Sequence, residues 1–172
     1  MSFIINKFDL ASKSSPFFIA EIGNNHNGSF EDAIKMIDMA KEAGADCVKF
    51  QIRNLNSLYR KKSLQKSGDD LGSEYIIDLL KRFELSIEQH EMLFEHCKKI
   101  DILYMCTPWD IPSIKVLEDF GVEAYKVASA DLTNLPLINE LIATNKPLIL
   151  STGMSTLEEI QITVDYLNKN DA

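Results

Sequence analysis

Short apolar runs alternate five times with amphipathic segments of helical period along this 172-residue chain, and no other feature constrains the fold as strongly. The runs are apolar on both faces, which is typical of parallel strands covered by helical crossovers. Their approximate ranges are 16–22, 46–52, 102–107, 124–131 and 147–152. The alternation predicts an α/β fold and leaves two architectures open, a doubly wound sheet and a (β/α)8 barrel.

The segments between the runs carry helix signals. Ser29 precedes one helical pattern that ends at Gly44, and further patterns cover 73–83, 110–120 and 135–144. Capping boxes are predicted at 86–89 and 155–158, each opening a helix. Residues 53–72 break the rhythm and are rich in basic side chains, so they form either a functional flap or a solvated loop.

Composition narrows the classes of partner. A net charge of -8 argues against a nucleic-acid surface. No apolar run approaches the ~18 residues of a membrane span, and the first residues lack the pattern of a signal peptide. Neither nucleotide-binding glycine motif is present. Cys47, Cys97 and Cys106 lie in apolar runs without a CxxC pair, so we expect reduced thiols and a cytoplasmic protein.

Lys126 is the first unusual residue, because it lies inside an expected buried strand. A buried ammonium group is costly unless an anion meets it. Ser129 follows at the end of the strand, where its hydroxyl group and loop amides can bind the same anion. The alternative is a core lysine that is paired with a nearby carboxylate.

Polar residues recur at the carboxyl end of every expected strand. In a barrel these ends converge on one mouth, where barrel enzymes have their active sites. Lys49 and Gln51 are two residues apart, so they share one face of their strand. The residues at the five strand ends are Glu21, Lys49, Gln51, Thr107, Lys126, Ser129, Ser151 and Thr152.

Two lysines and several hydroxyl groups at one mouth form a site for a dianion, of which phosphate is the obvious example. Glu21 and Asp131 are then candidates for acid–base groups beside it. Taken singly, Glu21 has a simpler interpretation as a salt-bridge partner, and Thr107 as a strand end before a proline.

The three histidines indicate a function less clearly than the strand-end residues do. His26 follows the first strand, and three roles are open for it: substrate contact, metal ligation, or holding its Asn-rich turn by hydrogen bonds. His90 and His96 lie six residues apart on one helix, which is not the spacing of a helical metal pair. We therefore interpret both as ordinary helix residues.

Six segments together resemble the N-acetylneuraminate (sialic acid) synthase family. They occur in the family's order and extend over nearly the whole chain. These segments are Ile19–Gly28, Val48–Gln51, Cys106–Pro108, Tyr125–Ser129, Asn134–Leu137 and Leu150–Met154. The resemblance implies a (β/α)8 barrel that condenses phosphoenolpyruvate with an N-acylmannosamine-like sugar, giving a nonulosonic acid and phosphate.

The resemblance also implies roles for single residues. Glu21 and Gln51 match positions facing the sugar and the reacting carbons. Ala130 and Asp131 replace the Gly-Glu of many members, which leaves the sugar open, because legionaminic and pseudaminic acid synthases are close relatives. The matches to phosphoenolpyruvate contacts are Lys49, Thr107, Lys126, Ser129 and Ser151.

A complete barrel needs about 250 residues. We therefore expect residues 1–172 to form one domain, truncated to the first five β-α units of a barrel. In this family a divalent metal, Mn or Mg, polarises the sugar aldehyde, and its ligands would lie outside this chain, as would a C-terminal antifreeze-like domain. The resemblance further implies a homo-oligomer, in the form of a dimer.

Two other functions stay open. A Schiff-base aldolase would use Lys126 as its nucleophile, because lysines on barrel strands can take that role. Alternatively, the chain is a non-catalytic barrel fragment that self-associates through its first and fifth strands, whose edges would be unpaired.

Overall fold

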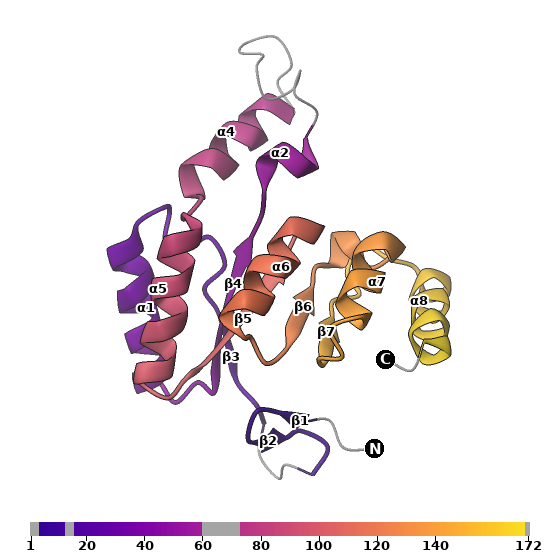
Figure 1. The fold of residues 1–172 in the computed structure, drawn as a ribbon, viewed down its shortest axis with the longest axis horizontal. Coiled ribbons are helices and arrows are strands. Elements are labelled where there is room, and N and C mark those ends of the chain that lie inside the picture. Colours follow the sequence, from indigo (N-terminus) through magenta and orange to yellow (C-terminus); the bar gives the residue numbers. More distant parts are fainter. Residues whose placement is uncertain (1–3, 13–15, 60–72, 171–172) are drawn as a thin grey trace.

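The computed structural model describes residues 4–12, 16–59 and 73–170, and its centre is a parallel sheet of five strands (Figure 1). The strands follow the five predicted apolar runs. They are β3 (Ile19–Glu21), β4 (Cys47–Ile52), β5 (Leu103–Pro108), β6 (Tyr125–Val127) and β7 (Leu148–Leu150).

The order of the strands decides between the two predicted architectures. Each strand pairs with its sequence neighbours, in the order β3-β4-β5-β6-β7. In a doubly wound sheet the order of the strands would instead reverse at a switch point, so that some sequence neighbours would not be paired. The fold is therefore the barrel type, a half-barrel of about five β-α units, as the resemblance implied.

Helices connect successive strands and cover one face of the sheet (Figure 1). The range 53–72 contains the short helix α2 and otherwise lies mostly in 60–72, outside the described residues, so the flap hypothesis stays a prediction. The helices are α1 (Phe30–Glu42), α2 (Leu55–Leu58), α4 (Ser73–Phe83), α5 (Ile87–Lys99), α6 (Ile111–Phe120), α7 (Leu135–Ile142) and α8 (Leu157–Lys169).

The predicted caps are confirmed at two helices and wrong by one residue at a third. Ser29 and Ser86 accept hydrogen bonds from the first turns of α1 and α5. At α8 the capping box consists of Thr156 and Glu159 rather than residues 155 and 158. The Thr156 hydroxyl accepts from the Glu159 amide, and Glu159 Oε2 accepts from the Thr156 amide at 2.7 Å.

The fourth strand is shorter than the predicted range 124–131. It ends at Val127, and Ser129–Asp131 form a 3₁₀ turn, η1. The Asp131 amide donates to the Ala128 carbonyl, and the Asp131 side chain accepts from Asn134, the N-cap of α7. The chain therefore leaves the sheet early because it must turn into α7.

The two faces of the sheet bury different neighbours. Val48, Phe50 and Tyr125 belong to the large core under the helices. Cys47 and Met105 point to the opposite, inner face and pack against Ile5. Ile5 belongs to an antiparallel hairpin of β1 (Ile4–Ile5) and β2 (Phe8–Asp9), which the sequence patterns did not predict.

Two predictions from composition can be compared with the structure. Within 4–12, 16–59 and 73–170, no helix is long and apolar enough to cross a membrane. Cys47, Cys97 and Cys106 are buried free thiols, as expected.

Candidate functional site

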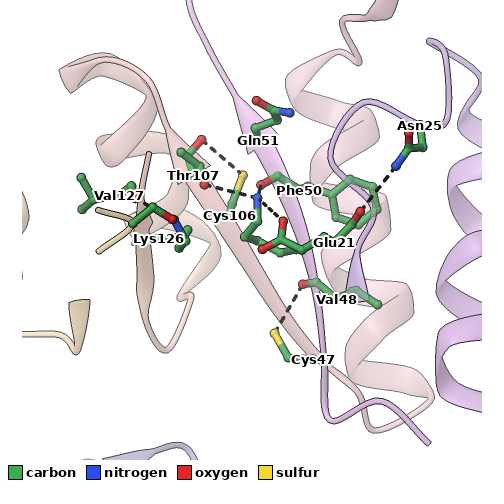
Figure 2. Close-up of polar contacts among 12 residues, drawn as sticks. Glu21, Asn25, Cys47, Val48, Phe50, Gln51, Cys106, Thr107, Lys126 and Val127 are labelled. Carbon is green, nitrogen blue, oxygen red and sulfur yellow. Dashed lines mark hydrogen bonds and ion pairs between the residues drawn. The ribbon is translucent and has the colours of Figure 1, made fainter. Parts of the chain in front are cut away.

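The register of the sheet places the predicted polar residues together at one end of the inner face. Glu21 pairs with Lys49 across β3 and β4, and Gln51 pairs with Thr107 across β4 and β5. Lys49 and Gln51 have the same strand parity as Cys47, so they too point inward. Figure 2 shows Glu21, Gln51, Thr107 and Lys126 on four successive strands.

Lys49 is the buried cation of this group. Only 7% of the residue is exposed, and its Nζ lies 2.9 Å from Glu21 Oε2 and 3.5 Å from Thr107 Oγ1. The Glu21 side chain is 58% exposed, so this carboxylate is hydrated on its outer side. Glu21 is thus a salt-bridge partner, and its acid–base role stays a prediction.

Lys126 is the second cation and is half-buried. Its Nζ donates to Ser151 Oγ and, at 2.7 Å, to the Val127 carbonyl. In the described part of the chain no carboxylate lies within ion-pair distance of it, so the interpretation as a carboxylate-paired core lysine finds no support there. Burial and then the Lys49 charge lower the pKa of Lys126, and the Glu21 carboxylate opposes this shift.

Ser129 lies beside the loop that follows β7. A Cβ atom on Gly153 would be 3.7 Å from Ser129 Oγ, so the ends of β6 and β7 meet at this point. Ser151, which accepts from Lys126, and Ser129, which lies beside Gly153, are therefore both at this end of the sheet.

Gln51 makes contacts that the sequence patterns did not predict. Its Oε1 accepts from Arg53 Nη2 at 2.6 Å and from Trp109 Nε1 at 2.9 Å. The Arg53 guanidinium lies 4.9 Å from the centroid of the Trp109 ring. Both partners directly follow a strand end, and that position is the one sequence signal that was available for them.

Two predicted residues lie apart from this hydrogen-bonded group. Asp131 is 9% exposed, and its Oδ1 accepts from Asn134 Nδ2 at 2.9 Å, while its buried Oδ2 has no partner among the described residues. His26 is 3% exposed, and its Nδ1 accepts from the Gly28 amide at 3.1 Å, so it holds the turn after β3. Burial lowers the pKa of His26.

The other histidines have structural partners. His90 Nδ1 lies 2.9 Å from the Tyr104 hydroxyl, and His96 Nε2 lies 2.7 Å from Asp38 Oδ1. In the ranges that the structure describes, no three His, Cys, Asp or Glu residues are placed to hold a metal ion.

Comparisons with known proteins show which proteins this chain is similar to. The chain is 38% identical over 157 residues to N,N'-diacetyllegionaminic acid synthase of Campylobacter jejuni, covering 90% of this chain and 47% of that protein. Human N-acetylneuraminate-9-phosphate synthase is 32% identical over 160 residues, with 90% and 44% covered. The chain therefore spans less than half the length of these relatives.

A solved structure gives the same result for the fold. The sialic acid synthetase of Leptospira borgpetersenii, in complex with citrate, superposes with a TM-score of 0.86 at 29% identity, covering all of this chain and 56% of that one. The model of the NeuB family matches residues 36–172, which include four of the five strand ends described above. The predicted resemblance is confirmed, and the chain belongs to the NeuB family.

Proposed function

We propose that the protein binds phosphoenolpyruvate on this inner face and condenses it with an N-acylated, mannosamine-like sugar, giving a nonulosonic acid and phosphate. Membership of the NeuB family supports the reaction class. The observation that carries the proposal is the pair of inward lysines, each with a hydroxyl partner in the next strand or directly after it. Lys49 has Thr107 in β5, and Lys126 has Ser151 directly after β7.

These lysines suit an anion because two partly buried ammonium groups repel one another. The Lys49 charge lowers the pKa of Lys126, and Glu21 neutralises Lys49 on one side only. An anion between the two ammonium groups would relieve this repulsion and accept charge-assisted hydrogen bonds from both. Phosphoenolpyruvate offers a carboxylate and a phosphate for the two lysine–hydroxyl pairs.

Glu21 is placed to handle a proton beside the bound anion. In the reaction, C3 of phosphoenolpyruvate forms a bond to the aldehyde carbon of the open-chain sugar, and the aldehyde oxygen takes up a proton. Water then adds at C2, loses a proton, and the bond between C2 and the phosphate oxygen breaks. The hydrated carboxylate of Glu21 can accept the proton of that water.

The residues that the structure describes do not form a site that fits the divalent metal implied by the resemblance. No group of three suitable ligands exists in the described part of the chain, and Glu21 is already engaged with Lys49. We therefore assign no step to a metal here. The expected dimer and the cytoplasmic location belong to the same proposal, the latter supported by three free buried thiols.

Calorimetric titration with phosphoenolpyruvate tests the proposal on this chain. We expect binding that Lys49→Ala and Lys126→Ala each abolish. Phosphate release with N-acetylmannosamine as the second substrate then tests turnover. Binding that survives both substitutions would show that the lysines do not form the site, and no binding by the unchanged chain would contradict the proposal.

The Schiff-base aldolase is a second candidate because one observation favours it. Burial and the neighbouring Lys49 lower the pKa of Lys126, which increases the neutral amine required for imine formation. Borohydride with pyruvate separates the two functions. The synthase leaves Lys126 unmodified, whereas an aldolase gives a reduced adduct on that residue, detectable by peptide mass spectrometry.

A further inference from the structure

The carboxamide of Gln51 is held in one orientation by two donors. Arg53 Nη2 and Trp109 Nε1 both donate to its Oε1, at 2.6 and 2.9 Å. Neither a guanidinium group nor an indole nitrogen can accept a hydrogen bond. A flipped amide would therefore place its NH₂ group against two donors and lose both hydrogen bonds, so the network determines which atom is the oxygen.

The Nε2 atom of Gln51 points to the other side, toward β3. A Cβ atom on Gly23 would lie 3.4 Å from Nε2, so the amide nitrogen lies over the second residue after the strand of Glu21. Gly23 also has a φ of +55°, and its lack of a side chain keeps the space beside Nε2 open. Gln51 thus presents N–H donors, and not its oxygen, on the Glu21 side.

Arg53 and Trp109 support each other in this arrangement. The guanidinium carbon of Arg53 lies 4.9 Å from the centre of the Trp109 ring, a cation–π distance. Burial lowers the pKa of Arg53, but a guanidinium group stays charged at any pH of interest, so its hydrogen bond to Gln51 is charge-assisted. We call the two hydrogen bonds from Arg53 and Trp109 to Gln51 Oε1 the amide lock, or simply the lock. The lock therefore does not depend on pH in the working range.

We propose that Arg53 and Trp109 are positioning residues that give Gln51 a fixed polarity, so that it recognises an acceptor oxygen of the sugar. The assignment rests on the proposed function, since the sugar is the ligand expected beside Glu21. It adds a specificity rule: the second substrate must present a carbonyl, ether or hydroxyl lone pair to Gln51. A substrate that offers only a donor at that point meets the N–H groups and is rejected.

The lock itself can be tested without any ligand. Trp109 is the single tryptophan of the chain, so the protein has one indole N–H resonance. We expect Gln51→Met to move that proton resonance upfield and to increase its temperature dependence, because the acceptor is lost. Gln51→Glu keeps an acceptor oxygen and should preserve the hydrogen bond. An indole resonance that is unchanged in Gln51→Met would overturn the lock.

The donor role is tested by calorimetry with N-acetylmannosamine in the presence of phosphoenolpyruvate. Gln51→Glu satisfies Arg53 and Trp109 but replaces both N–H donors by an oxygen, so we expect sugar affinity to fall at least tenfold while phosphoenolpyruvate affinity stays within twofold. Trp109→Phe keeps a ring under Arg53 and removes one donor, and we expect a loss of about threefold. Gln89→Glu, the same change at the cap of α5, is the control.

The outcomes separate the two proposals. Sugar affinity that is unchanged in Gln51→Glu, with normal binding of both substrates, overturns the role of Gln51 and leaves the proposed function intact. An unchanged chain that binds phosphoenolpyruvate but no sugar overturns the assignment of the acceptor to the sugar. If the unchanged chain binds neither substrate, the proposed function fails, and the indole resonance still decides whether the lock exists.

Discussion

Replacing Lys49 by methionine should separate binding from stability. Lys49 is 7% exposed and pairs with a carboxylate whose side chain is 58% exposed. Methionine keeps most of the length of the lysine stem and removes only the buried charge. Glu21 is left without its partner but remains hydrated, so no unpaired buried charge results.

The expected magnitudes follow from these exposures. Removing one member of a buried, hydrogen-bonded charge contact to a ligand costs about 2–5 kcal/mol, and at ~3 kcal/mol the dissociation constant for phosphoenolpyruvate rises ~150-fold. Removal of one partner of an ion pair is strongly destabilising when the other charge stays buried and unpaired, but the Glu21 side chain is mostly exposed. We therefore expect the free energy of unfolding to change by less than ~1 kcal/mol.

Calorimetric titration with phosphoenolpyruvate gives the dissociation constant, and unfolding in urea gives the free energy of unfolding of the same samples. Lys35→Met is the matched control, because Lys35 lies on α1 rather than at a strand end and forms an exposed helical pair with Asp32 at 3.0 Å. The reasoning is refuted if the affinity of Lys49→Met equals that of the control. A loss of more than ~3 kcal/mol of stability would instead make Lys49 a structural residue.

Four further predictions follow from single residues and edges. Burial lowers the pKa of His90 to about 4 against 6.5 in the unfolded chain, so the unfolded state takes up the proton first. The free energy of unfolding therefore has no contribution from His90 above pH 6.5 and falls toward pH 4, by about 2 kcal/mol at pH 5. Urea unfolding at several pH values should show that this pH dependence is lost in His90→Gln. Because the pKa of Lys126 is lowered, affinity for phosphoenolpyruvate should decline with rising pH before the ordinary lysine value of 10.5 is reached, and an affinity that is flat up to that pH contradicts the site. Gly28→Ala should cost about 2 kcal/mol or more in thermal unfolding, because its Cβ would lie 2.3 Å from the Arg82 carbonyl oxygen, whereas Gly44→Ala, with the same φ of +83° and open space, should cost only ~1 kcal/mol. The edges of the described sheet, β3 and β7, should cause self-association in sedimentation experiments, and a clean monomer at high concentration would disprove it.

Local patterns were sufficient for much of the fold. All five strands were predicted near their observed places, because a buried strand needs a short apolar run and turn residues at its ends. Helix starts were found from hydroxyl caps, although the capping box of α8 begins one residue later, at Thr156. Thr156 and Ser155 are chemically equivalent as caps, and only the packing of the helix selects between them.

The candidate site was predictable in composition but not in connectivity. The alternation of side chains along a strand placed Lys49 and Gln51 on one face, and the structure agrees. The partners of these residues are distant in sequence: Thr107 is 58 positions from Lys49, and Trp109 is 58 positions from Gln51. No periodicity within one strand carries information about such contacts.

The sequence by itself determined which segments become strands and helices, and which strand ends carry charge and hydroxyl groups, because both depend on residues within a few positions of one another. Local patterns left both the doubly wound sheet and the barrel open, and the strand order is that of the barrel type that the family resemblance implied. Only the tertiary structure decided that a hairpin packs Ile5 against the inner face of the sheet, and that Gln51 turns its nitrogen toward β3. These features arise from the order and register of strands that are far apart in the chain, and hydrogen bonds across that distance form only when the strands are paired.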